Sequence, residues 1–68
     1  MKYTLTFNLG WREQYQCHAE SLTDAISGAV RAGYDRAPCK AQNEIAEFEQ
    51  KQVPLAWTQA TQEQYADI

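Results

Sequence analysis

Apolar and polar residues alternate along the first twenty positions, in two runs separated by a short connection at Gly10–Glu13. The run Lys2–Leu9 sets four apolar residues against four polar ones: Tyr3, Leu5, Phe7 and Leu9 against Lys2, Thr4, Thr6 and Asn8. The second run repeats the pattern, with Tyr15, Cys17 and Ala19 against Gln14, Gln16, His18 and Glu20. A period of two is typical of β-strands, and Gly10 can take the positive φ of a tight turn. The sequence therefore predicts an antiparallel hairpin with one apolar face and one polar face.

The apolar spacing changes to three and four residues after Ser21, which is the spacing of one face of a helix. The residues on this stripe are Leu22, Ala25, Ile26, Ala29 and Val30. Ser21 is a favoured N-cap, Asp24 follows it by three residues, and Gly33 is placed to end the helix. We predict an amphipathic helix that packs on the apolar face of the hairpin.

The second half of the chain has a weaker pattern. Asp35–Lys40, which contains Pro38, is predicted as a loop. Asn43–Val53 is rich in residues that favour helix, yet a helix there would bury only a thin, broken stripe. We therefore predict a strand over Ile45–Gln50, with a helix over this segment as the open alternative. Val53–Thr58 is predicted as an edge strand, and the remaining tail is polar.

These elements define one α+β domain over residues 1–68, a small antiparallel sheet with one helix packed on one face in the order ββαββ. The predicted core joins the apolar sides of the hairpin and the helix, with three residues from later in the chain. Its members are Tyr3, Leu5, Phe7, Tyr15, Cys17, Leu22, Ile26, Ala29, Val30, Tyr34, Phe48 and Leu55.

Charge and composition narrow the possible partners. The chain has a net charge of −3 and a pI of about 4.9, and its six basic residues are scattered along the sequence. Because affinity for nucleic acid comes chiefly from clustered Lys and Arg, direct nucleic-acid binding is disfavoured. No apolar run reaches the roughly 18 residues of a membrane span. The alternating first residues do not resemble a signal peptide, and Cys17 and Cys39 are interpreted as thiols, so we expect a cytoplasmic protein.

The reactive residues do not form a recognisable catalytic or metal site. Cys17 and His18 are neighbours in sequence, but successive strand residues point to opposite sides of a sheet. Neither a CxxC motif nor a glycine-rich phosphate loop is present, so we expect no cofactor and no metal. Three glutamates, Glu44, Glu47 and Glu49, are close in sequence and are interpreted as a solvated face in preference to an acid–base pair.

Two tryptophans suggest partner contacts instead. Trp and Arg are enriched among the residues that dominate interface energies, so Trp11 and Arg12 at the hairpin turn are the first candidates. Gln16, His18 and Glu47 are expected to frame them, and Trp57 lies near the predicted edge strand. Packing of either tryptophan against the core remains the alternative. The free edge of Val53–Thr58 also makes a homodimer possible.

The order and size of these elements over most of the chain, from KYTLTFNL through AES into SLTDAISGAVRAG and then a polar β-rich end, resemble small accessory proteins of phages and mobile elements, among them the anti-CRISPR proteins. The resemblance implies a non-enzymatic inhibitor, acting in the host cell cytoplasm, that blocks a protein or ribonucleoprotein surface such as a CRISPR effector complex. It implies no cofactor and carries over no functional residue. A nucleic-acid-binding or accessory module and a small enzyme remain the alternatives.

Overall fold

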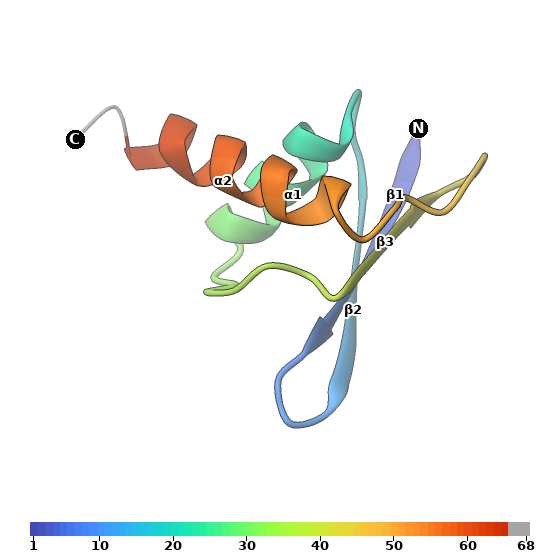
Figure 1. The fold of residues 1–68 in the computed structure, drawn as a ribbon, viewed down its shortest axis with the longest axis horizontal. Helices are drawn as coiled ribbons and strands as arrows, with labels where there is room; N and C mark the ends of the chain where they lie inside the picture. Colours follow the sequence, from blue (N-terminus) through green and yellow to red (C-terminus); the bar gives the residue numbers. More distant parts are fainter. Residues whose placement is uncertain (66–68) are drawn as a thin grey trace.

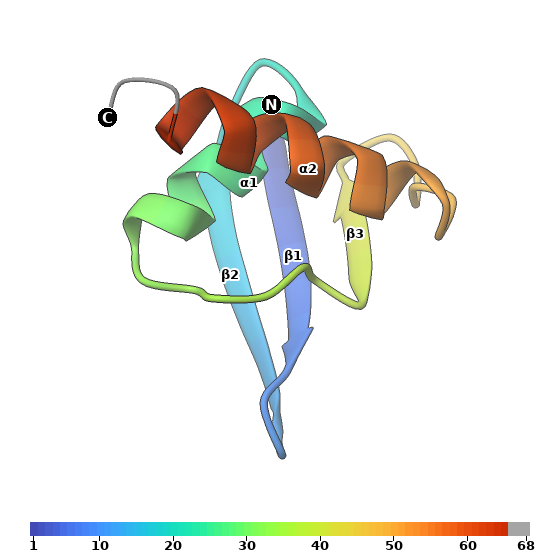
Figure 2. The same ribbon diagram turned by 60° about the vertical axis from the view of Figure 1, so that its left-hand side comes forward.

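The computed structural model describes residues 1–65, the last three of them for the backbone only. The elements are β1 (Lys2–Asn8), β2 (Arg12–His18), α1 (Leu22–Arg31), β3 (Lys40–Asn43) and α2 (Gln52–Tyr65). The strands form one antiparallel sheet in the order β2-β1-β3, and both helices lie on the same side of it (Figures 1 and 2). The α+β class is confirmed. The predicted order ββαββ is wrong, because the described residues follow the order ββαβα with three strands.

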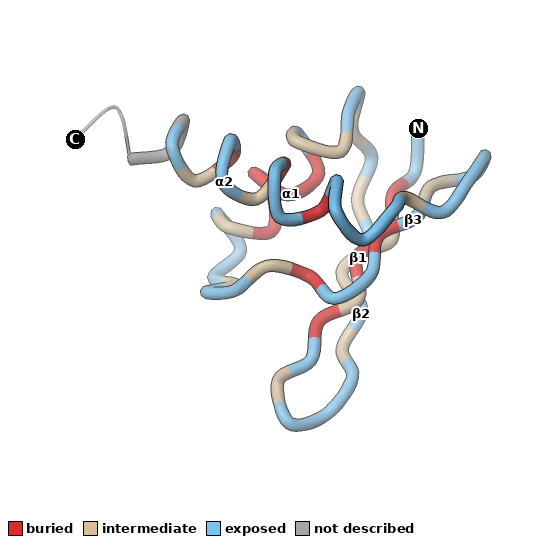
Figure 3. Tube along the Cα trace, in the orientation of Figure 1, coloured by how far each residue is buried: buried red, intermediate tan, exposed pale blue. Residues whose placement is uncertain are grey.

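The N-terminal hairpin forms as the alternation predicts. β1 and β2 pair in antiparallel register with Leu5 opposite Tyr15. Tyr3, Leu5 and Phe7 are buried, whereas the polar residues between them remain partly exposed. β2 begins at Arg12, two residues before the second alternating run. Figure 3 shows the buried positions gathered where the sheet meets the helices.

Helix α1 begins and ends at the predicted signals. The Ser21 hydroxyl oxygen accepts a hydrogen bond from the Asp24 N–H at 3.2 Å, so one of the free N–H groups of the first turn has a partner. Gly33 follows the helix with a φ of +107°, a conformation that glycine adopts without strain. The predicted stripe lies against the sheet, and Ala25, Ile26 and Ala29 are fully buried.

Strand β3 begins at Lys40, the last residue of the predicted loop, and continues through the next three residues, for which the sequence predicts no strand. It pairs with the free side of β1, with Ala41 opposite Leu5 and fully buried. The strand predicted over Ile45–Gln50 is wrong. The Asn43 side-chain oxygen accepts hydrogen bonds from the N–H groups of Ile45 and Ala46 at 2.8 and 2.9 Å, which folds the chain into a turn.

After this turn the chain runs back beside β3 only briefly. Glu47 pairs with Gln42 as an isolated bridge, and the Phe48 N–H donates to the Ala41 carbonyl oxygen at 2.9 Å. The ring of Phe48 stacks on that of Tyr3, with centroids 5.9 Å apart. Phe48 therefore packs against the core as predicted, although it does so from a turn.

Helix α2 replaces the strand predicted over Val53–Thr58, and it extends through most of the segment expected to be a polar tail. Its buried residues, Val53, Ala56 and Ala60, follow helical spacing. Pro54 lies in the first turn, where its missing N–H removes no helix hydrogen bond. Leu55 is 71% exposed, so its predicted place in the core is wrong. Residues 66–68 of the tail lie outside the described part of the chain.

The two helices pack against each other. The hydroxyl of Thr23 in α1 donates a hydrogen bond to the Gln59 side-chain oxygen in α2, 3.4 Å away. In the part of the chain that the structure describes, neither helix combines the length and apolarity that a transmembrane span requires. No helix of the described chain covers the opposite side of the sheet, and we refer to that side as the open face (Figures 1 and 2).

Candidate interaction surface

The open face consists of rows of polar side chains that cross the sheet. Because paired residues of an antiparallel sheet point to the same side, the register orders these rows. Thr4 lies opposite both Gln16 and Gln42, and Thr6 lies opposite both Gln14 and Lys40. The bridge to Gln42 extends the first row to Glu47. Lys2 with His18, and Asn8 with Arg12, form the rows at either end.

Two cations that are far apart in the sequence meet on this face. Arg12 from β2 and Lys40 from β3 line one polar pocket of about 400 Å³, which Thr6, Gln14 and Gln42 complete. A second pocket of about 250 Å³ shares Thr6, Arg12 and Lys40. The scattered distribution of basic residues in the sequence does not indicate this pair. The only available signal was that Lys40 and Gln42 flank Ala41 with a period of two.

The three glutamates of the predicted acidic cluster have separate contacts. The Glu47 carboxylate lies 3.3 Å from the Lys40 ammonium. The Glu44 carboxylate accepts a hydrogen bond from the backbone N–H of Lys2 at 3.1 Å, and Glu49 lies 3.9 Å from the Lys51 ammonium. These residues therefore interact with different neighbours, which favours the interpretation of a solvated surface over that of a carboxylate pair.

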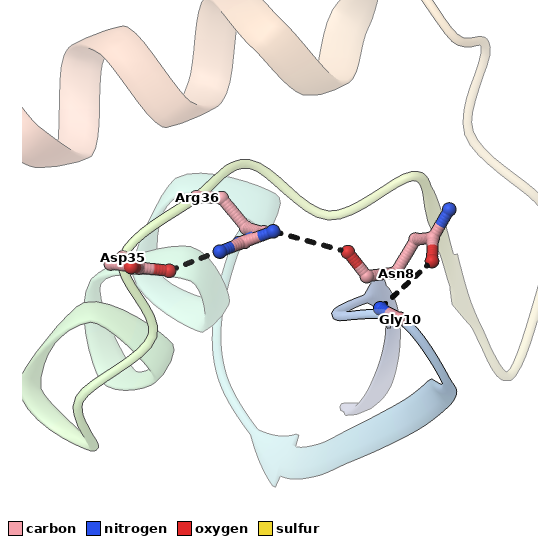
Figure 4. Close-up of polar contacts among 4 residues, drawn as sticks. All are labelled: Asn8, Gly10, Asp35 and Arg36. Carbon is pink, nitrogen blue, oxygen red and sulfur yellow. Dashed lines mark hydrogen bonds and ion pairs between the residues drawn. The ribbon is translucent and has the colours of Figure 1, made fainter.

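The hairpin turn presents Trp11 to solvent. Its side chain is 63% exposed, so the alternative in which it folds over the core is wrong. Gly10 has a φ of +93°, and its N–H donates to the Asn8 side-chain oxygen at 3.4 Å. Figure 4 shows Arg36 beside the same strand end, donating to the Asn8 carbonyl oxygen at 3.5 Å. The turn is thus tied to the loop that follows α1.

Arg36 also pairs with its neighbour in sequence. Its Nε donates to the Asp35 carboxylate at 3.0 Å. This hydrogen bond, together with the charge of the guanidinium, lowers the pKa of Asp35 below its ordinary value. Both side chains are exposed, so the pair orients Arg36 and contributes little to folding stability.

Cys17 and His18 point to opposite sides of the sheet, as the alternation predicts. The Cys17 sulfur lies on the helix side, 4.0 Å from the Ala25 carbonyl oxygen, and burial raises the pKa of its thiol. His18 is exposed on the open face. A thiol with a raised pKa is a poor nucleophile at neutral pH, and this one has no histidine beside it. Among the side chains that the structure describes, those of residues 1–62, no group of three or more His, Cys, Asp or Glu is arranged to hold a metal ion.

A second cluster lies on the helix side of β2. The Tyr34 hydroxyl donates a hydrogen bond to the Glu13 carboxylate at 2.7 Å. This bond raises the pKa of Tyr34, and burial and the negative charge of Glu13 act in the same direction. The two residues border a pocket of about 360 Å³ whose other lining residues are Leu9, Tyr15, Ala32, Gly33 and Asp35.

The structure brings together most of the residues predicted to contact a partner. Arg12, Gln16, His18 and Glu47 share the open face, and Trp11 lies at its hairpin end. Trp57 is separate, because it belongs to α2 and packs against the core from the helix side. Comparison of the chain with known families, curated proteins and solved structures gives no match.

Proposed function

We propose that this chain is a small non-enzymatic inhibitor that binds the surface of a protein or ribonucleoprotein complex and blocks it sterically. The observation that carries the proposal is the open face, whose crossing rows contain hydrogen-bonding side chains from all three strands. An apolar anchor, Trp11, and a cation, Arg12, stand at one end of these rows. Such an arrangement suits a partner that presents complementary polar groups around a pocket for the indole ring.

The positions of the remaining polar groups favour a binding function over a catalytic one. Cys17 and His18, the nearest pair of reactive side chains in sequence, lie on opposite sides of the sheet. Glu47, which the open face includes, is paired with Lys40. The proposed mechanism needs only that the bound chain occupies a surface the partner must use.

The partner we propose first is a CRISPR effector complex. Support for this choice comes from the resemblance of most of the chain, in the order and size of its elements, to anti-CRISPR proteins. The hairpin followed by a helix agrees with that order, whereas the expected β-rich end does not, because the chain continues into β3 and α2. The cytoplasm of a phage-infected or element-bearing cell is the corresponding location. The test begins with capture of purified effector complexes by the immobilised chain. Absence of a complex at micromolar concentration with every effector type would reject this partner.

Single substitutions test whether the open face makes the contact. Trp11→Ala is expected to weaken binding by about thirtyfold, which corresponds to about 2 kcal/mol. Arg12→Ala is expected to weaken it as well. Leu55→Ala and Arg31→Ala are matched controls, because both residues are exposed on the helix side. Equal losses for the controls and the open-face variants would place the contact elsewhere.

A second candidate function rests on the pocket that Arg12 and Lys40 share. Two cations beside hydroxyl and amide groups are a suitable site for a phosphate of a single-stranded nucleic acid. The carboxylate of Glu47 beside Lys40 opposes it. A binding isotherm measured over a series of salt concentrations distinguishes the two functions. A phosphate contact by Arg12 predicts that Arg12→Ala reduces the salt slope by about 1, whereas affinity that does not change with salt rejects nucleic acid.

A further inference from the structure

One edge of the sheet is covered and the other is open. β3 has only four residues, and on its outer side the segment after it forms the bridge between Gln42 and Glu47. β2 forms the opposite edge with seven residues and contains no proline (Figures 1 and 2). Among residues 1–65, no other segment pairs with its outer side. Exposed strand edges of this length are surfaces to which a further strand can add.

The pairing with β1 shows which backbone groups of β2 point outward. Met1 and Ala19 exchange backbone hydrogen bonds, and the Leu9 N–H donates to the Trp11 carbonyl oxygen. Because hydrogen-bonded and non-hydrogen-bonded pairs alternate along an antiparallel ladder, the odd-numbered residues of β2 bond to β1. The outward N–H and carbonyl groups therefore belong to the even-numbered residues: Arg12, Gln14, Gln16 and His18.

The side chains along this edge are incompletely covered. In the central strand Tyr3, Leu5 and Phe7 are buried, whereas Tyr15 and Cys17 on the helix side of β2 are only half-buried. A further strand beside β2 would cover apolar surface here in addition to pairing its backbone groups.

Charges at the start of β2 and two residues beyond its end favour a second copy of the same chain as that partner. In an antiparallel pairing related by a two-fold axis at Gln16, Gln14 lies opposite His18 of the second copy. Continued beyond the end of β2, the same register places Arg12 opposite Glu20, which lies in the bend before α1. Among the described residues, neither Arg12 nor Glu20 forms an ion pair within its own chain. The symmetry forms the Arg12–Glu20 pair twice. A register centred on Tyr15 would instead place Arg12 opposite His18, and no carboxylate would face it.

We propose that two copies of the chain associate through their β2 edges, in antiparallel register centred on Gln16, to form one continuous six-stranded sheet. Both helix layers then lie on one side of this sheet and both open faces on the other. The homodimer expected from a Val53–Thr58 strand has no basis, because that segment is helical. Pairing of the β2 edges also gives a homodimer, and it does not require the partner that the chain is proposed to inhibit.

Charge reversal tests both the edge and the register. Sedimentation equilibrium of the purified full chain, at rising concentration and low salt, is expected to show a mass that increases from 7.8 kDa toward twice that value. Arg12→Glu and Glu20→Arg are each expected to lower the association constant by about tenfold, because each places two pairs of like charges opposite each other. The double variant restores the opposite-charge pairs and is expected to regain most of the association.

Arg31→Glu is the matched control, since it makes the same charge change at an exposed residue that belongs to α1 and not to β2. It is expected to leave the association constant unchanged. A wild-type mass that stays at 7.8 kDa up to millimolar concentration would overturn the proposal. So would a dimer that tolerates both single reversals, or one that the double variant fails to restore.

A backbone substitution tests the edge independently of charge. The Gln16 N–H points away from β1, so Gln16→Pro removes an outward donor without removing a hydrogen bond of the hairpin. The variant is expected to keep the circular dichroism spectrum of the wild type and to remain monomeric. A folded Gln16→Pro variant that associates as strongly as the wild type would contradict pairing through β2.

Discussion

The ring of Tyr34 stacks on that of Phe7, with centroids 4.1 Å apart and the ring planes 14° from parallel. Phe7 is fully buried at the end of β1, whereas Tyr34 lies just beyond α1 and donates its hydroxyl hydrogen to Glu13 of β2. Tyr34 therefore joins the chain after α1 to both strands of the hairpin, through a ring contact and a hydrogen bond.

Substitution of Tyr34 separates these two contributions. Tyr34→Phe keeps the stacked ring and removes the hydrogen bond, so we expect a loss of about 1 kcal/mol in the free energy of unfolding. Tyr34→Ala also removes the ring from Phe7 and is expected to cost about 3 kcal/mol. Urea titrations followed by circular dichroism measure both values. Equal losses for the two variants would contradict a stabilising role for the stacked ring.

The same hydrogen bond predicts a dependence of stability on pH. Glu13 raises the pKa of Tyr34 above its ordinary value of 10.0, so the folded state holds the phenolic proton more tightly than the unfolded chain. The contribution of this hydrogen bond to the free energy of unfolding is fully present below pH 10.0, and it decreases as the pH rises through the higher pKa of Tyr34 in the folded state. Comparison of wild type with Tyr34→Phe isolates it from other groups that titrate there. If the difference in the free energy of unfolding between wild type and Tyr34→Phe does not shrink with rising pH, the hydrogen bond to Glu13 is not the source of the pH dependence.

Helix α2, which forms where the sequence predicts a strand, leads us to expect different losses of stability on substitution of two residues that would share one face of a strand. Val53 and Leu55 would share one face of a strand, but in α2 Val53 is 3% exposed and Leu55 71%. We expect Val53→Ala to reduce the free energy of unfolding by about 2 kcal/mol. Leu55→Ala is expected to change it by less than about 0.5 kcal/mol. Comparable losses in urea titrations would support the strand instead.

The elements that the sequence predicts correctly are those with large apolar residues at regular spacing. β1 alternates Tyr3, Leu5 and Phe7 with polar residues, and α1 adds cap signals to an unbroken stripe. α2 lacks such a signal, because two of its buried positions, Ala56 and Ala60, are alanines. Its first residues, read alone, also match the pattern of a short strand that contains Pro54.

β3 illustrates a different limit of the sequence. Lys40–Asn43 contains one apolar residue, Ala41, and forms a strand because the free side of β1 supplies partners for its backbone groups. The same limit applies to the open face, because part of it comes from β3. Gln16 and His18 are placed on the open face by their spacing within the hairpin, whereas Lys40 reaches the same face only through the long-range pairing of β3 with β1.

The two cysteines are expected to differ in reactivity. Cys39 is exposed, whereas Cys17 is half-buried, and burial raises the pKa of the Cys17 thiol above its ordinary value, so less of Cys17 is ionised at neutral pH than of an ordinary cysteine. We expect a thiol-specific reagent to modify Cys39 at least about tenfold faster than Cys17 in the folded protein. Cys39→Ser should remove the fast phase and leave the slow one. A fast phase that persists in this variant would show that the Cys17 thiol is accessible.

Gly28 of α1 lies close to the side chain of Tyr15 in β2, and the Tyr15 hydroxyl group decides whether alanine at position 28 stabilises the protein. A Cβ placed at Gly28 would lie 3.1 Å from the Tyr15 hydroxyl oxygen, closer than ordinary van der Waals contact. Alanine within a helix is favoured over glycine by about 1 kcal/mol. In the wild-type background this gain and the crowding of Tyr15 oppose each other, so we expect Gly28→Ala to change the free energy of unfolding by less than about 0.5 kcal/mol.

Removal of the hydroxyl should reveal the helix preference. In the Tyr15→Phe background, Gly28→Ala is expected to raise the free energy of unfolding by about 0.5–1 kcal/mol, because the nearest atom is gone and the ring carbons lie at about 4.0 Å. A double-mutant cycle built from urea titrations measures the coupling between the two positions directly. An equal effect of Gly28→Ala in both backgrounds would show that the Tyr15 hydroxyl does not constrain α1.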